Sequence, residues 1–194
     1  MKKIMTFVII SLFSVALFAS DIDSSIGVAG GIYMNFGAVE IENGDSNHLA
    51  LTAGAALSPT YDLTVDNGKT FTYGMRARGD FLIGVDEPDF FQADIFIGPK
   101  GTIAFSDKAR LNLAIGGTLG YSIFEATNSK DELLVSKTLS WGFGPDLYFD
   151  YDITDSFGIG IGYIGKINYD FGRPFNDRIF LLSSDVYLSA YYSF

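Results

Sequence analysis

Bulky apolar and small or polar side chains alternate along most of this chain with the two-residue period of β-strands. Between residues 26 and 36 the bulky apolar side chains stand at even positions, and small or polar ones stand at odd positions. A helix would repeat its apolar positions every three to four residues. The alternation predicts eight strands of about 11 to 17 residues, longer than ordinary strands and long enough to cross a membrane.

Two kinds of connection join the predicted strands. Three are tight turns rich in Asp, Asn, Gly and Ser, and they lie at 66–69, 106–109 and 152–155. The other connections are mostly longer, and they lie at 37–47, 86–89, 125–132 and 172–178. Short turns at one end and longer loops at the other are typical of membrane barrels. We therefore predict an all-β fold, an eight-stranded antiparallel up-and-down transmembrane β-barrel.

The size of the side chains indicates which face of the barrel points inward. The lumen of an eight-stranded barrel is just wide enough to be filled by side chains or one small ligand. The bulky apolar face is too large for that space, whereas the opposite face carries small residues such as Gly116, Gly120 and Gly160. We therefore expect the apolar face to contact lipid. The alternative is a soluble barrel with an apolar interior, and solubility without detergent would identify it.

Charged residues follow the small face, and we expect them to form a paired network that plugs the lumen. The network residues are Arg76, Arg78, Asp80, Asp94, Lys166 and Asp185. Strand order places Arg76 and Arg78 near Asp94, and Lys166 near Asp185. Because an unpaired interior charge is costly, Asp94→Ala should lower the urea midpoint. The competing interpretation of these charges is an ion pathway, which the narrow bore disfavours.

Prolines and aromatic residues add two predictions about the strands. Pro59, Pro99 and Pro145 each lie seven residues before a tight turn. Since proline has no amide hydrogen for the ladder, we expect bulges or local interruptions there. Aromatic residues gather near both ends of the strands, as the interfacial girdles of membrane barrels require.

The first twenty residues have the layout of a secretory signal peptide. Lys2 and Lys3 precede an apolar run that ends at Phe18, and small residues follow at Ala19 and Ser20. We expect residues 1–20 to be a cleaved signal peptide and residues 21–194 to be the barrel. The alternative is an uncleaved membrane anchor, for which the apolar run is slightly short.

Composition excludes several classes of function. The chain has 194 residues and no cysteine, which rules out disulfides, thiolate metal sites and a cysteine nucleophile. Its net charge of −10 argues against nucleic-acid binding.

His48 is the one histidine, and with Ser46 nearby it suggests lipid-modifying chemistry only weakly; we interpret it as a loop residue. Glu42, Asn43, Asp45 and Asn47 suggest calcium, but an acidic solvated loop explains them. We predict no enzyme activity, no metal and no cofactor.

These features together resemble the small eight-stranded outer-membrane barrels of the OmpA, OmpX and OmpW kind. The likeness covers about residues 21–194 and rests on the hairpin from Leu147 to Tyr163 and on the ending Val186, Leu188, Ala190, Tyr192 and Phe194. The resemblance implies that Tyr192 and Phe194 form the terminal signal read by the barrel assembly machinery. It also implies transit through the periplasm with chaperones and residence in the outer membrane.

The functional expectation follows from the fold class and from the lack of a catalytic motif. We expect an integral outer-membrane protein with a structural, surface-interaction or membrane-integrity role and a largely plugged lumen. Its partners would be outer-membrane lipid and, through acidic loops, cations or a basic host surface. The main alternative is a narrow channel for small, including hydrophobic, molecules.

Overall fold

The fold is a single closed sheet of eight strands. The computed structural model describes residues 22–40, 47–65, 70–84, 89–127, 133–170 and 178–194, and these contain no helix that is long and apolar enough to cross a membrane. The strands are β1 (Ile22–Glu40), β2 (Asn47–Val65), β3 (Phe71–Gly84), β4 (Asp89–Ala104), β5 (Ala109–Thr127), β6 (Leu133–Asp152), β7 (Phe157–Asp170) and β8 (Arg178–Ser193).

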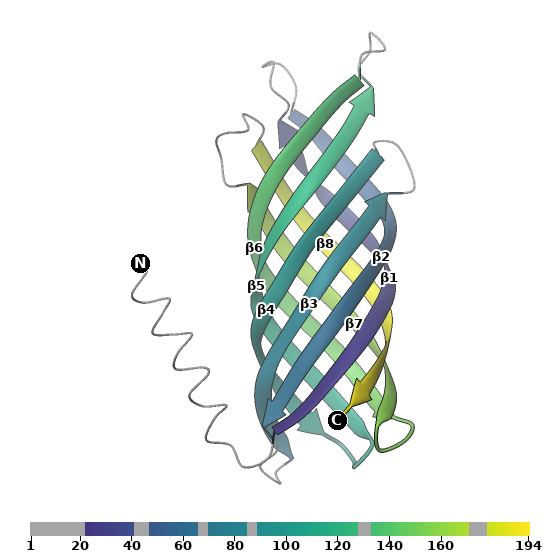
Figure 1. Cartoon of the computed structure of the whole chain (residues 1–194). Coiled ribbons are helices and arrows are strands. Elements are labelled where there is room, and N and C mark those ends of the chain that lie inside the picture. The colour runs from purple at the N-terminus through teal and green to yellow at the C-terminus, as the bar shows by residue number, and fades with distance from the viewer. Residues whose placement is uncertain (1–21, 41–46, 66–69, 85–88, 128–132, 171–177) are drawn as a thin grey trace, which may run out of the picture.

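Each strand pairs antiparallel with its neighbours in the chain, and β8 pairs with β1 to close the barrel. Ile26 lies opposite Tyr192 in that closing ladder, and the backbone N–H of Phe194 donates to Ser24. Figure 1 shows all eight strands inclined to the barrel axis. Closure leaves no edge strand with unpaired backbone groups. The predicted eight-stranded antiparallel barrel is confirmed.

Four strands are longer than we predicted. β1, β2 and β5 each have 19 residues and β6 has 20, whereas the alternating pattern predicted at most about 17. The ladder continues past the apolar stretch, and Glu40 still pairs with Asn47 and Thr127 with Leu133. Antiparallel pairing needs only backbone groups, so it extends into segments whose side chains no longer alternate.

Hydroxyl side chains fix two of the tight turns at one end of the barrel, which we call the short-turn end. Ser106 Oγ accepts the backbone N–H of Ala109 at 3.1 Å, and Thr154 Oγ1 accepts that of Phe157 at 3.0 Å. Such bonds hold the chain in a turn between two strands. The third turn, 66–69, lies outside the described residues. We call the opposite end the long-loop end.

The two faces of the sheet are oriented as the volume argument predicted. On β1, Tyr33 and Asn35 point inward and are fully buried, whereas Ile32 is 71% exposed on the outside. Across the described residues, bulky apolar side chains cover the exterior, and the charged residues of the strand centres are buried inside. An apolar exterior over a polar interior is the arrangement of an outer-membrane barrel.

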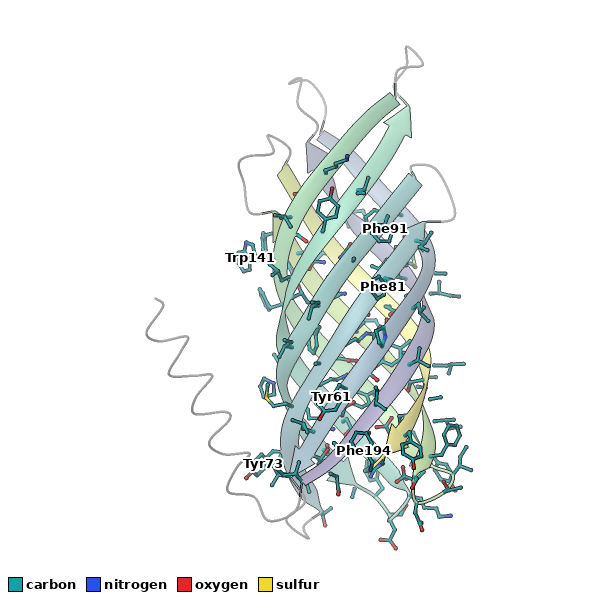
Figure 2. The ribbon with its side chains drawn as sticks, viewed as in Figure 1. Tyr61, Tyr73, Phe81, Phe91, Trp141 and Phe194 are labelled. Carbon is teal, nitrogen blue, oxygen red and sulfur yellow. The ribbon has the colours of Figure 1, made fainter. Side chains whose placement is uncertain are left out.

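Exposed aromatic side chains lie toward both ends of the exterior. Figure 2 shows Tyr61, Tyr73 and Phe194 toward the short-turn end, and Phe91 and Trp141 toward the other. The Trp141 ring stacks on that of Tyr169, with centroids 5.3 Å apart. These two groups have the positions of the interfacial girdles of a membrane barrel.

The three strand prolines interrupt the ladder on one side only. Pro59 pairs with Val28 in the ladder to the preceding strand, but the ladder to the following strand skips the rungs of Ser58 and Pro59. Pro99 in β4 and Pro145 in β6 repeat this pattern toward β5 and β7. The register is the same on both sides of each gap, so these are interruptions and not bulges. The predicted interruptions are confirmed, and their cause is the missing amide hydrogen.

Candidate functional site

The inside of the barrel carries a first group of charges, the short-turn layer, formed by Asp62, Arg76, Lys100, Asp146 and Tyr148. Arg76 donates to Asp62 and Asp146, both at 2.6 Å. Asp62 also accepts from Lys100 Nζ at 3.2 Å and from the Tyr148 hydroxyl at 2.8 Å. All five side chains are buried, and two cations face two carboxylates. The layer is therefore electrically balanced and ties β2, β3, β4 and β6 together across the lumen.

A second group of charges, the long-loop layer, lies on the other side of Tyr187 and consists of Arg78, Asp80, Asp94, Lys166 and Asp185. Arg78 donates to Asp80 and Asp185, both at 2.5 Å. Lys166 donates to Asp80 at 2.8 Å and to Asp94 at 3.0 Å. Two cations here face three carboxylates, so one carboxylate is in excess.

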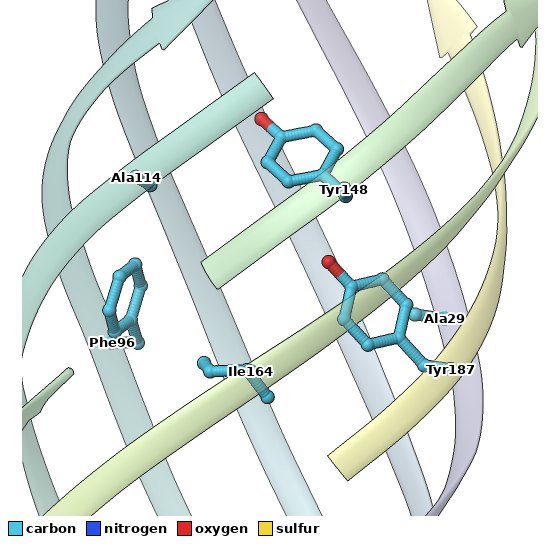
Figure 3. Packing of buried hydrophobic residues seen from close by; sticks show 6 residues of the cluster. All are labelled: Ala29, Phe96, Ala114, Tyr148, Ile164 and Tyr187. Carbon is cyan, nitrogen blue, oxygen red and sulfur yellow. The ribbon is translucent and has the colours of Figure 1, made fainter. Parts of the chain in front are cut away.

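Tyr187 connects the two layers, and its ring and that of Tyr148 fill space in the lumen. The Tyr187 hydroxyl donates to Asp146 at 2.5 Å, while its ring lies 4.1 Å from the Arg78 guanidinium carbon. Tyr148 covers Arg76 in the same way at 3.8 Å. Figure 3 shows both rings beside Phe96, Ile164, Ala29 and Ala114, the buried apolar side chains that occupy the rest of this level. Cation–π contacts and apolar packing thus leave little free bore at mid-depth.

The structure places five of the six predicted lumen residues in the long-loop layer and Arg76 in the short-turn layer, with different partners from those that strand order suggested. Asp94 binds Lys166 and neither arginine, and Asp185 binds Arg78 and not Lys166. The predicted pairing was wrong because it considered only adjacent strands. In a narrow barrel, long side chains reach across the lumen, and the strand stagger decides which ones meet.

Several residues of these layers were not among the six predicted ones. They are Ser58, Asp62, Gln92, Lys100, Asp146, Tyr148 and Tyr187. Their signal was present in the sequence, since Tyr148 shares its face with Asp146 and Tyr187 shares its face with Asp185. The sequence argument assigned only charged side chains to the lumen network, and so it left out the buried tyrosines Tyr148 and Tyr187.

A further set of buried polar atoms has no hydrogen-bond partner in the described part of the chain. The set comprises Tyr33 OH, Asn35 Oδ1 and Nδ2, Thr52 Oγ1, Gln92 Oε1, Arg78 Nη1 and Asp185 Oδ1. Asn35 and Thr52 lie directly opposite each other on β1 and β2.

The short-turn end of the barrel opens into a polar cavity of about 470 Å³, which we call the vestibule. Its floor is the short-turn layer, with Asp62 and Lys100 on the surface. Hydroxyl and amide side chains form most of its walls, namely Ser24, Ser25, Thr64, Thr70, Thr72, Thr102, Ser106, Asn112, Tyr191 and Ser193. Asp23, Asp107, Arg110 and Asp150 supply further charges.

Some of the remaining candidate residues named from the sequence lie in the described part of the chain, and the others lie outside it. Phe194 is 70% exposed at the end of β8, and Tyr192 is also exposed on the outer face. The side chains of Glu42, Asn43, Asp45, Ser46, Asn47 and His48 lie outside the described residues. Among the residues that are described, no three His, Asp or Glu side chains are placed to hold a metal ion.

Comparison with known proteins places the chain by its fold. No protein-family model and no curated protein matches the sequence. The crystal structure of Neisserial surface protein A (NspA) is similar with a TM-score of 0.56 at 13% identity, over 90% of this chain and 100% of that chain. The resemblance to small outer-membrane barrels is therefore confirmed for the fold.

Two further solved structures show weaker similarity. Ail, the attachment invasion locus protein of Yersinia pestis, has a TM-score of 0.45 at 19% identity, over 89% of this chain and 98% of that chain. The outer membrane protease OmpT from Escherichia coli has a TM-score of 0.47 at 10% identity, over 91% and 98%.

Proposed function

We propose that this protein is an integral outer-membrane barrel that conducts no solutes and serves a structural, surface-interaction or membrane-integrity role. The observation that carries this proposal is the pair of charged layers in the lumen. Arg76 alone binds side chains of β2, β6 and β8, and Arg78 binds side chains of β3, β2 and β8. A solute passing through would have to separate these buried ion pairs, which costs several kcal/mol for each pair broken.

The route and the surroundings of the protein follow from its two ends. We infer that residues 1–20 direct export and are removed, and that Tyr192 and Phe194 engage the assembly machinery after chaperone escort through the periplasm. The short-turn end then faces the periplasm and the long-loop end faces outward, as in other barrels of this kind. Acidic residues in the outer connections, including Asp86, Glu87, Asp131 and Glu132, favour cationic or basic partners there.

The proposed lack of enzyme activity rests on the chemistry of the lumen. Asp62, Asp80, Asp94, Asp146 and Asp185 are committed to ion pairs. The Ser58 hydroxyl donates to Asp80 at 2.6 Å, but Arg78 and Lys166 hold that carboxylate in its charged form, in which it is a weak general base. An activity at His48 would revive the enzymatic interpretation, and loss of lipid modification in His48→Ala would reveal it.

Ion conductance in planar bilayers tests the closed lumen. We expect the wild-type barrel to conduct no measurable current. A variant with Arg76→Ser, Tyr148→Ala, Arg78→Ser and Tyr187→Ala should conduct, because it removes the arginine of each charged layer and the ring that covers it. Gel mobility of unboiled against boiled samples confirms that both proteins are folded barrels. Wild-type current as large as that of the variant would contradict the closed lumen and favour the narrow channel.

A further inference from the structure

The long-loop layer has a charge that its own residues do not balance. Its five charged side chains are between 1% and 5% exposed, and two cations face three carboxylates. A net negative charge buried away from water is costly, and binding of a cation or a proton removes it. In the described part of the chain, no three His, Asp or Glu side chains are placed to hold a metal ion. A proton is therefore the ligand that fits this layer.

Two of the three carboxylates are unsuitable for that proton, because donors occupy both of their oxygens. Asp80 accepts from Ser58 and Arg78 at Oδ1 and from Lys166 at Oδ2. Asp94 accepts from Lys166 at both oxygens. Protonation of either carboxylate would set an O–H group against a donor and would weaken a contact with a cation.

The third carboxylate, Asp185, has a free oxygen. Its Oδ2 accepts from Arg78 Nη2, but its Oδ1 is buried and has no hydrogen-bond partner. The contact is thus single, and it lacks the bidentate geometry that makes a guanidinium–carboxylate pair strong. Oδ1 and the backbone carbonyl oxygen of Val186 both lie beside Cα of Gly31, where a Cβ would collide with them. A proton on Oδ1 has an acceptor nearby, whereas an ionised Oδ1 would face a second acceptor without a donor.

The groups around Asp185 do not supply a second cation. The titratable and charged groups that face it are Arg78 and Asp80 from β3, Lys166 from β7, Tyr33 from β1 and, on β8 itself, Tyr187. Arg78 is shared with Asp80, and Lys166 binds the other two carboxylates. Tyrosine hydroxyls are neutral at pH 7. One shared arginine is therefore all that would oppose a negative charge on Asp185.

We propose that Asp185 holds a proton at Oδ1 in the folded barrel at neutral pH, so that the long-loop layer, like the short-turn layer, has no net charge. The proposal goes beyond the function proposed above and depends only on the burial of the layer. Its consequence is a stability that depends on pH. The unfolded chain ionises Asp185 above pH ~4, so folding takes up one proton, and the free energy of unfolding falls as the pH rises until that proton is released.

Infrared spectroscopy of the folded barrel in an ester-free detergent tests for the proton directly. A protonated carboxyl group has a C=O stretching band that a carboxylate lacks. The difference spectrum between wild type and Asp185→Asn at pH 7 should contain this band. Asp155→Asn is the matched control, because Asp155 is exposed on a turn, and its difference spectrum should lack the band. A spectrum for Asp185→Asn without the band would overturn the proposal, and it is the result expected if all three carboxylates were ionised.

Urea unfolding shows which carboxyl group holds the proton. Asp185→Asn and Asp94→Asn each remove one carboxyl group from the layer. Asp185→Asn needs no proton to fold, so its midpoint at pH 7 should lie above that of the wild type, and the gap should close toward pH ~4. Asp94→Asn replaces a carboxylate that Lys166 binds, and its midpoint should fall. The reverse order would place the proton on Asp94 and overturn the assignment.

The slope of stability against pH counts the protons taken up. Between about pH 5 and pH 7, the unfolding equilibrium constant should rise about ten-fold more per pH unit for the wild type than for Asp185→Asn, because one proton is taken up on folding. Equal slopes would contradict the proposal. Each variant must keep its heat-dependent gel shift. A lumen without this proton can still be closed, so failure here leaves the conductance result standing.

Discussion

At the level of single residues, Lys166 is one of the two cations that hold the long-loop layer together. It comes from β7 and contacts two carboxylates, Asp80 and Asp94, that lie directly opposite each other on β3 and β4. Both carboxylates are almost completely buried. The lysine therefore compensates two charges that would otherwise repel each other in a medium of low polarity.

Replacing Lys166 should cost more stability than replacing either of its partners. Lys166→Met leaves Asp94 without a cation, and we expect the free energy of unfolding to fall by about 3–5 kcal/mol. Asp94→Ala should also destabilise the barrel, but less, because Lys166 keeps Asp80 and the layer loses its excess carboxylate. Urea unfolding in lipid vesicles measures both. Asp155→Ala on an exposed turn is the control, and equal midpoints for Lys166→Met and wild type would show that the layer is not stabilising.

At the level of the strands, the three interrupted ladders lack backbone hydrogen bonds at the same depth of the barrel. Pro99 lies opposite Ile115, both side chains are exposed on the outer face, and the ladder between β4 and β5 skips two rungs there. Pro59 and Pro145 repeat this at β2–β3 and β6–β7, whereas β5–β6 is paired without a gap. The barrel therefore consists of strongly and weakly joined pairs of strands.

Restoring the missing donor should strengthen one of these weak ladders. In Pro99→Val, the new amide can donate to β5, and the valine side chain can pack against Ile115. We expect slower hydrogen exchange for the amide protons of β4 and β5 beside residue 99. The β6–β7 ladder at Pro145 is the internal reference and should exchange as before. If exchange of the amide protons beside residue 99 is unchanged, the proline is not the cause of the interruption.

The strands and their two faces follow from the sequence, but the contacts inside the barrel do not. The period of two specifies which side chains point inward, since Arg76, Asp94 and Lys166 all lie on the small face. The pairing Arg78–Asp185 was not predictable, because it depends on how far each strand is shifted against the next. The vestibule is likewise a product of that shift, which brings residues from distant strands to one end. The connections predicted at 37–47 and 125–132 were too long, because backbone pairing extends beyond the apolar pattern.

At the level of the whole molecule, the exterior and the interior of the barrel differ in how much a charged side chain costs, and this difference decides which face of the sheet points outward. The exterior at mid-depth carries bulky apolar side chains such as Ile32 and Ile115, both more than half exposed. No water is available there to solvate a charge if the barrel spans a membrane, whereas the turns lie at the membrane surface. A charge introduced on the exterior should therefore destabilise the protein in proportion to its depth.

Arginine substitutions at two depths measure this dependence. Ile32→Arg, midway between the aromatic girdles, should lower the free energy of unfolding in lipid vesicles by about 2–4 kcal/mol. Ile153→Arg is the matched control, because Ile153 is also exposed and apolar but stands in a tight turn at the short-turn end, where the cost should be about 0–1 kcal/mol. A soluble barrel would tolerate both substitutions equally, because water would surround each arginine. Equal unfolding free energies for the two variants would thus mean that the apolar face does not contact lipid, whereas a clear difference measures how deeply the barrel is embedded.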